Sequence, residues 1–192
     1  MRAGPQDALI IVDLQNDFLP SGRLPVANGD RIIPVVNRLA ALPFQAVVAT
    51  QDWHPQDHCS FPAQNGPWPV HCVQGTEGAE LAALLRPEPL TAVFRKGMAQ
   101  DVDSYSAFAD NAGQNPTGLK GFLQERGVTR IFVCGLAYDV CVSHTARDGM
   151  ALGFETCVVA DACASAATPP DDVTAKLRAE GVQVMQAEML MA

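Results

Sequence analysis

The sequence predicts a single α/β domain built on a mostly parallel β-sheet. Short apolar runs rich in valine and isoleucine recur along the chain, and helical patterns lie between several of them. None of these runs alternates apolar with polar residues, which is typical of strands that are buried on both faces. The 192 residues suffice for one domain with a sizeable core, so we assign residues 1–192 to one domain.

Six strands and four helices are predicted in order along the chain. The strands cover residues 8–12, 46–50, 91–94, 130–134, 156–160 and 182–185. The helices cover residues 30–39, 118–125, 140–152 and 171–179. In the first helix, apolar residues stand three and four positions apart, as on one face of an α-helix. The second and third helices are predicted to end close to Gly127 and Gly153, because glycine often follows the end of a helix. Strands that alternate with helices are joined by right-handed crossovers, which makes the sheet mostly parallel.

Composition and charge exclude several classes of protein. Apolar residues make up 48% of the chain and charged residues 18%, which is typical of a globular protein. The net charge of −8 gives no support to nucleic-acid binding. The apolar stretch that starts at Ala8 is too short for a signal peptide or a membrane span, so we expect no membrane partner and a location in the cytoplasm. There the six cysteines would be free thiols. The sequence is compatible with an oligomer and does not indicate the oligomeric state.

Polar residues follow four of the predicted strands. Asp13 follows the first strand, Asp52 and His54 the second, and Lys96 the third, while Cys141 lies a few residues after the fourth. Ligands of open α/β sheets bind outside the carboxyl ends of the strands. We therefore expect these side chains to meet at one edge of the sheet.

Cys141 stands where a strand is predicted to end and a helix to begin. In the first turn of a helix, unpaired N–H groups and the helix dipole stabilise a thiolate, and a nearby Lys96 would lower the thiol pKa further. The same N–H groups can bind an oxyanion. Asp13 could accept the thiol proton and pass it to a leaving group, so the three side chains form a set suited to acyl transfer. Each residue taken alone could also have a purely structural role: Cys141 as a core residue, Lys96 as a surface lysine and Asp13 as a turn residue.

A second cluster lies in residues 51–75, a stretch rich in proline, glycine and histidine that is too long for an ordinary loop. Asp52, His54 and the later His71 offer three ligands and leave positions open for water or substrate, as catalytic metal sites do. An alternative is a structural zinc site with a spacing that matches no usual zinc module. Its ligands would be His58, Cys59, His71 and Cys72.

Six motifs of the chain resemble those of one known family. They are IIVDLQNDF, VVATQDWHPQDHCSF, WPVHCVQGTEGAEL, FRKG, DSYSAF and GLAYDVCVSHTARDG. Together they resemble the nicotinamidase and pyrazinamidase branch of the isochorismatase-like cysteine hydrolases, in order, over about residues 8–165. DLQNDF or GLAYDVCV alone would indicate only the superfamily, whereas DWH together with WPVHC is typical of the nicotinamidases.

The resemblance implies a six-stranded parallel sheet between layers of helices. It also implies the hydrolysis of nicotinamide to nicotinate and ammonia, a step of NAD salvage, and activity on pyrazinamide is expected as well. By motif, Asp13 would be the general acid and base, Lys96 the cation between Asp13 and the nucleophile, and Cys141 the nucleophile that forms a thioester. The oxyanion hole would consist of the backbone N–H groups of Ala137 and Cys141, with a cis peptide bond between Leu136 and Ala137.

The resemblance further implies a divalent metal ion on Asp52, His54 and His71, usually Zn²⁺ and in some members Mn²⁺ or Fe²⁺. This ion would hold the pyridine nitrogen of the substrate. Family members differ in the remaining contact to the ion, and both candidates, His58 and Ser60, are present here. Four positions match the walls of the substrate pocket, and they are Phe18, Leu24, Trp68 and Tyr105.

Two other functions stay open at this stage. Another hydrolase of the superfamily, such as an isochorismatase or an N-carbamoyl amidase, would not need the three metal ligands together. A metal-binding or thiol redox module is the alternative from a different class, but the chain has no C-x-x-C motif and the Asp, Lys and Cys set would then have no role. Tyr138 stands where small residues are frequent in the family, so it could narrow the pocket or point away from it.

Overall fold

The computed structural model describes residues 2–191, and its centre is a six-stranded sheet in which every neighbouring pair of strands is parallel. The strands are β1 Asp7–Val12, β2 Ala46–Asp52, β3 Ala92–Lys96, β4 Arg130–Leu136, β5 Glu155–Ala164 and β6 Gln183–Met185. Their order in the sheet is β3-β2-β1-β4-β5-β6. The prediction of six strands in a parallel sheet is therefore confirmed.

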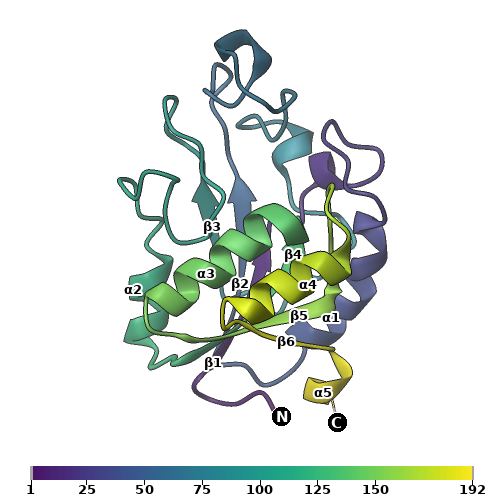
Figure 1. The fold of residues 1–192 in the computed structure, drawn as a ribbon, viewed down its shortest axis with the longest axis vertical. Helices are drawn as coiled ribbons and strands as arrows, with labels where there is room; N and C mark the ends of the chain where they lie inside the picture. The colour runs from purple at the N-terminus through teal and green to yellow at the C-terminus, as the bar shows by residue number, and fades with distance from the viewer. Residues whose placement is uncertain (1, 192) are drawn as a thin grey trace.

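Helices cover both faces of the sheet and complete a three-layer α/β architecture. They are α1 Ile33–Ala40, α2 Leu119–Glu125, α3 Ser143–Ala151, α4 Pro170–Ala179 and α5 Glu188–Met191. Helices α1 and α5 share one apolar core with the sheet, while α2, α3 and α4 pack into the core on the other face, where α3 and α4 lie in front of the strands in Figure 1. Within residues 2–191 no helix has the length and apolar character needed to cross a membrane.

The start of α1 differs from the prediction. A 3₁₀ turn, Gly29–Ile32, comes first, and the α-helix begins only at Ile33. The cause is Pro34, which has no N–H group to donate and is tolerated only in the first turn of an α-helix. A helix that began at Asp30 would have placed this proline beyond that turn.

The strand β3 departs from the expectation that every strand is buried on both faces. It is an edge strand, and along it exposed residues alternate with less exposed ones, so that Val93 is 44% exposed. The other edge strand, β6, is also only partly buried. The central strands β1 and β2 are buried throughout, as predicted.

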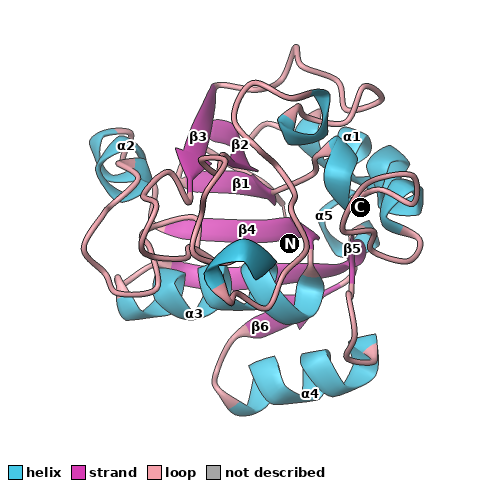
Figure 2. Ribbon diagram, turned by 90° about the horizontal axis from the view of Figure 1, so that it is seen from above, coloured by secondary structure: helices cyan, strands magenta, loops and turns pink. Residues whose placement is uncertain are grey.

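Long loops gather at the carboxyl ends of the strands and extend above the sheet in Figure 1. Figure 2 shows the same end from above, where these loops cross over the strands. The strand order reverses between β1 and β4, because the chain moves outward on one side to β2 and β3 and on the other side to β5 and β6. Open α/β sheets bind ligands at such a switch point, so the fold itself indicates where a site belongs.

Strands β1 and β4 approach each other closely at Gly135, and a substitution there tests this contact. The φ angle of Gly135 is +113°, and a Cβ atom there would lie 2.2 Å from the carbonyl oxygen of Val12 in β1. We therefore expect Gly135→Ala to lower the free energy of unfolding by about 1–3 kcal/mol, measured by urea denaturation.

The matched control for this substitution is Gly121→Ala on α2. A Cβ atom at Gly121 would have no neighbour within 4 Å, and alanine is the better helix former, so stability should hold or rise. A Gly135→Ala variant as stable as the unmodified protein would contradict the close approach of β4 to β1.

Candidate active site

The carboxyl ends of the strands bring Asp13, Lys96 and Cys141 together, as the sequence predicted. Asp13 follows β1, Lys96 is the last residue of β3, and Cys141 lies in the π-helical turn Tyr138–Val142 between β4 and α3. The Nζ atom of Lys96 lies 2.8 Å from Oδ2 of Asp13 and 3.8 Å from Sγ of Cys141. The side chains of Asp13 and Lys96 are fully buried.

The conformation of Asp13 is fixed by the neighbouring strand. Its φ angle is +46°, which is unusual for a residue with a side chain. The hydroxyl of Thr50 on β2 accepts a hydrogen bond from the Asp13 N–H group at 3.1 Å and donates one to its Oδ1 atom at 2.7 Å. Thr50 therefore holds the main chain and the carboxylate of Asp13 together.

Burial governs the acidity of the three groups. Burial raises the pKa of the Cys141 thiol well above its usual value, and the positive charge of Lys96 offsets only part of this effect. Burial also raises the pKa of Asp13 to about 6, again against the effect of Lys96. For Lys96 burial acts against the charged form, but Asp13 and Asp52 raise its pKa well above the usual value, so the ammonium group keeps its proton.

The prediction of a lowered pKa for Cys141 is therefore wrong. The side chain is only 7% exposed, and the nearby carboxylates of Asp13 and Asp52 disfavour a further negative charge. The proton thus rests on sulfur until the thiol reacts. Asp13 can receive it, because a carboxylate with a raised pKa is a stronger base than an ordinary one.

The second predicted cluster also forms. Asp52 ends β2, His54 follows it by two residues, and His71 comes from the long loop. The Nε2 atoms of His54 and His71 lie 3.5 Å and 4.0 Å from Oδ2 of Asp52, and all three side chains are buried. One candidate ligand atom from each residue lies within 4.8 Å of the others, which is a spacing that a single metal ion can bridge.

Hydrogen bonds orient both histidines for metal binding. The Nδ1 atom of His54 lies 2.9 Å from the carbonyl oxygen of Gly97, and that of His71 lies 2.7 Å from the carbonyl oxygen of Pro69. A carbonyl oxygen can only accept, so each Nδ1 carries a hydrogen, and Nε2, which faces Asp52, is the nitrogen of each ring that can offer a lone pair to a metal ion. These residues therefore fit a divalent metal ion.

His58 and Ser60 contact each other rather than joining this triad. Nδ1 of His58 lies 2.7 Å from Oγ of Ser60, Nε2 lies 3.2 Å from the carbonyl oxygen of Val102, and the ring stacks on His54 at 4.0 Å between centroids. Among the described residues, His58 groups with His54 and Asp103 at metal-compatible spacing, and no such group contains Cys59 or Cys72. The structure thus does not assemble the alternative zinc site.

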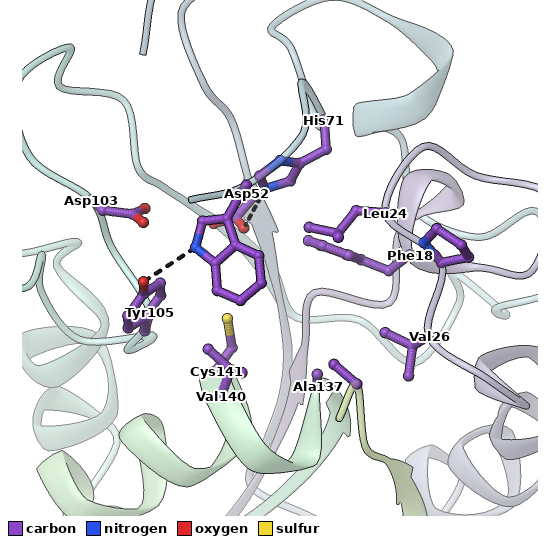
Figure 3. A pocket seen from close by; sticks show the side chains of 13 residues that line it. Phe18, Leu24, Val26, Asp52, His71, Asp103, Tyr105, Ala137, Val140 and Cys141 are labelled. Atoms are coloured by element: carbon purple, nitrogen blue, oxygen red, sulfur yellow. Dashed lines mark hydrogen bonds and ion pairs between the residues drawn. The ribbon is translucent and has the colours of Figure 1, made fainter. Parts of the chain in front are cut away.

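One pocket connects the two clusters. Its lining includes all four predicted wall positions, Phe18, Leu24, Trp68 and Tyr105, together with Asp52, His71, Ala137 and Cys141. Figure 3 shows the sulfur of Cys141 pointing into this pocket. The indole Nε1 of Trp68 donates to the hydroxyl of Tyr105 at 3.2 Å, so two of the predicted walls support each other.

Some pocket residues were missed by the sequence reasoning. They are Pro25, Val26, Asp103, Val140 and Ala166. Asp103 stands directly before the SYSAF part of a motif that was recognised, so the signal was available. The cis peptide bond between Leu136 and Ala137 is present as the resemblance implied. Tyr138 points away from the pocket, since it is fully buried and its hydroxyl lies 2.8 Å from Oγ1 of Thr174 on α4.

Comparison with known proteins places the chain in a family. The model of the isochorismatase domain matches residues 7–189. The chain belongs to the isochorismatase family. Within this family it is 42% identical over 179 residues to a nicotinamidase of Acinetobacter baylyi, with 85% of this chain and 83% of that protein covered.

Two solved structures of the family extend this comparison. PnC1 from L. infantum, solved in complex with nicotinate, has 44% sequence identity and a TM-score of 0.95, with 99% of this chain and 98% of that chain covered. The pyrazinamidase of Pyrococcus horikoshii, solved in complex with zinc, has 38% identity and a TM-score of 0.84, with 95% and 99% covered.

We call Asp52, His54 and His71 the metal set, and the loss of one of these side chains should weaken metal binding. His71→Ala removes one of three ligand atoms, so the dissociation constant for Zn²⁺ should rise by more than about 100-fold, measured by competition with a chelator. His144→Ala is the matched control, because His144 lies on α3 and contacts Tyr105 rather than the triad. Equal zinc affinity in the two variants would contradict the metal site.

Proposed function

We propose that the protein is a nicotinamidase that hydrolyses nicotinamide to nicotinate and ammonia. The observation that carries the proposal is the single pocket that joins the thiol of Cys141 to Asp52 and His71 of the metal set. A planar ring that carries a carboxamide at one side and a ring nitrogen at the other matches such a pocket. The names of the relatives support the same substrate, as does the nicotinate in the complex of PnC1 from L. infantum.

The side chains of the chain account for the acyl transfer. Asp13 takes the thiol proton of Cys141 as sulfur attacks the carboxamide carbon, and the charge of Lys96 stabilises the carboxylate until then. We assign the oxyanion to the backbone N–H groups of Ala137 and Cys141, where one lost donor typically costs about 10²–10³ in rate. Asp13 then protonates the nitrogen that leaves as ammonia. Water hydrolyses the thioester while Asp13 accepts a proton from it, and Asp13 returns this proton to the departing sulfur of Cys141.

A divalent metal held by Asp52, His54 and His71 would supply a Lewis-acid contact for the pyridine nitrogen. We propose Zn²⁺, in line with the zinc complex of the Pyrococcus horikoshii pyrazinamidase, with Mn²⁺ and Fe²⁺ as alternatives. Asp52 keeps its negative charge. Burial acts to raise its pKa, but Lys96, His54 and His71 together hold that pKa far below the usual range. The role in NAD salvage, the activity on pyrazinamide and the location in the cytoplasm stay predictions of the sequence.

The nucleophile can be tested by substitution. Cys141→Ala should lower kcat for ammonia release from nicotinamide by about 10⁴–10⁶-fold, because among the described residues no other cysteine lines this pocket. Its metal content should not change, since Cys141 is not a member of the triad of Asp52, His54 and His71. Cys59→Ala is the control and should keep full turnover. Near-normal turnover by Cys141→Ala would exclude Cys141 as the nucleophile.

Removal of the metal separates this function from those of other hydrolases of the family. Ammonia release from nicotinamide should fall on treatment with EDTA and return with Zn²⁺, Mn²⁺ or Fe²⁺, since the ring nitrogen would lose its contact. Turnover that survives complete stripping would keep the acyl-transfer chemistry but exclude the metal role. If the loaded protein released no ammonia from nicotinamide, isochorismate and N-carbamoyl amides would be tested instead.

A further inference from the structure

Two buried side chains next to Asp13 have no part in the chemistry described above. Gln15 is fully buried and Asp17 is 5% exposed, and both lie in the segment between Asp13 and the pocket residue Phe18. Neither lines the pocket. Buried amide and carboxylate groups need hydrogen-bond partners, so their partners reveal what these residues hold in place.

Asp17 is bound to the residue that follows the metal ligand His71. Its Oδ2 atom accepts a hydrogen bond from the Cys72 N–H group at 2.7 Å, across 55 positions of sequence. Cys72 has a φ angle of +45°, a left-handed conformation that a residue with a side chain rarely adopts. A strong hydrogen bond that this N–H group donates to a carboxylate favours that conformation, which in turn sets the direction in which the chain presents His71.

Gln15 holds the main chain of a second ligand. Its Oε1 atom accepts a hydrogen bond from the Asp52 N–H group at 2.8 Å, and its Nε2 group donates to the Asp52 carbonyl oxygen at 2.8 Å and to that of Ala79 at 2.9 Å. One side-chain amide thus satisfies both main-chain groups of Asp52. The segment that follows the proposed general base therefore contacts the ligand Asp52 and the residue next to the ligand His71.

The surroundings of Asp17 are shaped to admit its carboxylate. A Cβ atom at Gly78 would lie 2.2 Å from Oδ2 of Asp17, so glycine is required for the carboxylate to stay where it is. The remaining oxygen, Oδ1, accepts a weaker hydrogen bond from the Arg23 N–H group at 3.3 Å. No cation pairs with this carboxylate among the ion pairs of residues 2–191, so its shortest contact is the Cys72 N–H group.

We propose that Asp17 is a positioning residue for the metal site, acting through its hydrogen bond to Cys72 to hold His71 in the geometry that binds the ion. Gln15 has the corresponding role for Asp52. The inference rests on the metal site of the proposed function, and it concerns ion affinity rather than the chemical step.

The test measures zinc affinity, without substrate, in the full-length protein. Asp17→Ala should raise the dissociation constant for Zn²⁺ by about 10–100-fold, as is typical when a group that orients a metal ligand is lost. Asp17→Asn keeps an oxygen that can accept from the Cys72 N–H group, so its affinity should stay well within about tenfold of the unmodified protein. At saturating Co²⁺, the visible absorption spectrum of Asp17→Ala should also shift, since the imidazole of His71 is oriented differently.

The matched control is Asp7→Ala. Asp7 is also a buried aspartate, 3% exposed, and it accepts from the Gly4 N–H group and pairs with Arg130 at the opposite end of β1. Its loss should lower stability but leave zinc affinity unchanged. If Asp17→Ala fails to fold, Gly78→Ala provides the second variant, because its new methyl group displaces the Asp17 carboxylate without removing it, and zinc affinity should again fall.

Three results would overturn the inference. The first is unchanged zinc affinity in Asp17→Ala or in Gly78→Ala. The second is an Asp17→Asn variant that binds as weakly as Asp17→Ala, which would show that the negative charge rather than the hydrogen bond matters. The third is a loss of affinity in Asp7→Ala equal to that in Asp17→Ala, which would indicate general destabilisation. If the unmodified protein bound no divalent metal, the metal site of the proposed function would fail first, and the two failures are thus distinct.

Discussion

The buried ammonium group of Lys96 is the interaction on which the site depends. Its Nζ atom lies 2.8 Å from Oδ2 of Asp13 and 2.5 Å from Oδ1 of Asp52, and it also donates to the carbonyl oxygen of Ser104 at 2.8 Å. Two carboxylates that are shielded from water could not both stay ionised without a cation between them. Lys96 therefore lets Asp13 and Asp52, the proposed general base and a proposed metal ligand, stay ionised side by side in a buried site.

The fold explains why these charges meet. Asp13, Asp52 and Lys96 are carried by β1, β2 and β3, which are neighbours in the sheet, and the register pairs Asp52 directly with Lys96. Cys141 arrives from the other side of the switch point, after β4. Four segments that are far apart in sequence are thus placed at one edge by the order of the strands. The long loops extend above this edge in Figure 1, and the loop that contains His71 adds this side chain to the pocket lining.

Much of this arrangement could be predicted because the site residues stand directly after, or a few positions after, the apolar runs that form the strands. Asp13, Lys96 and Cys141 each follow a short apolar run, and the parallel sheet brings such positions together. The acidity of Cys141 could not be predicted in the same way, since it depends on the depth of burial, which no local pattern encodes. The same holds for the partners of Asp17, which binds a main-chain group 55 positions away. The start of α1 was predictable, because Pro34 was visible in the sequence.

The protonated state of the Cys141 thiol affects how readily this side chain is oxidised. Peroxides attack thiolates rather than thiols, and access to the sulfur limits the reaction further. A thiol that is 7% exposed and whose pKa is raised by burial, as that of Cys141 is, is therefore a poor target for oxidation to sulfenic acid. Under the proposed function, the thiol would lose its proton only as it attacks a bound amide, so the sulfur would be protected between turnovers.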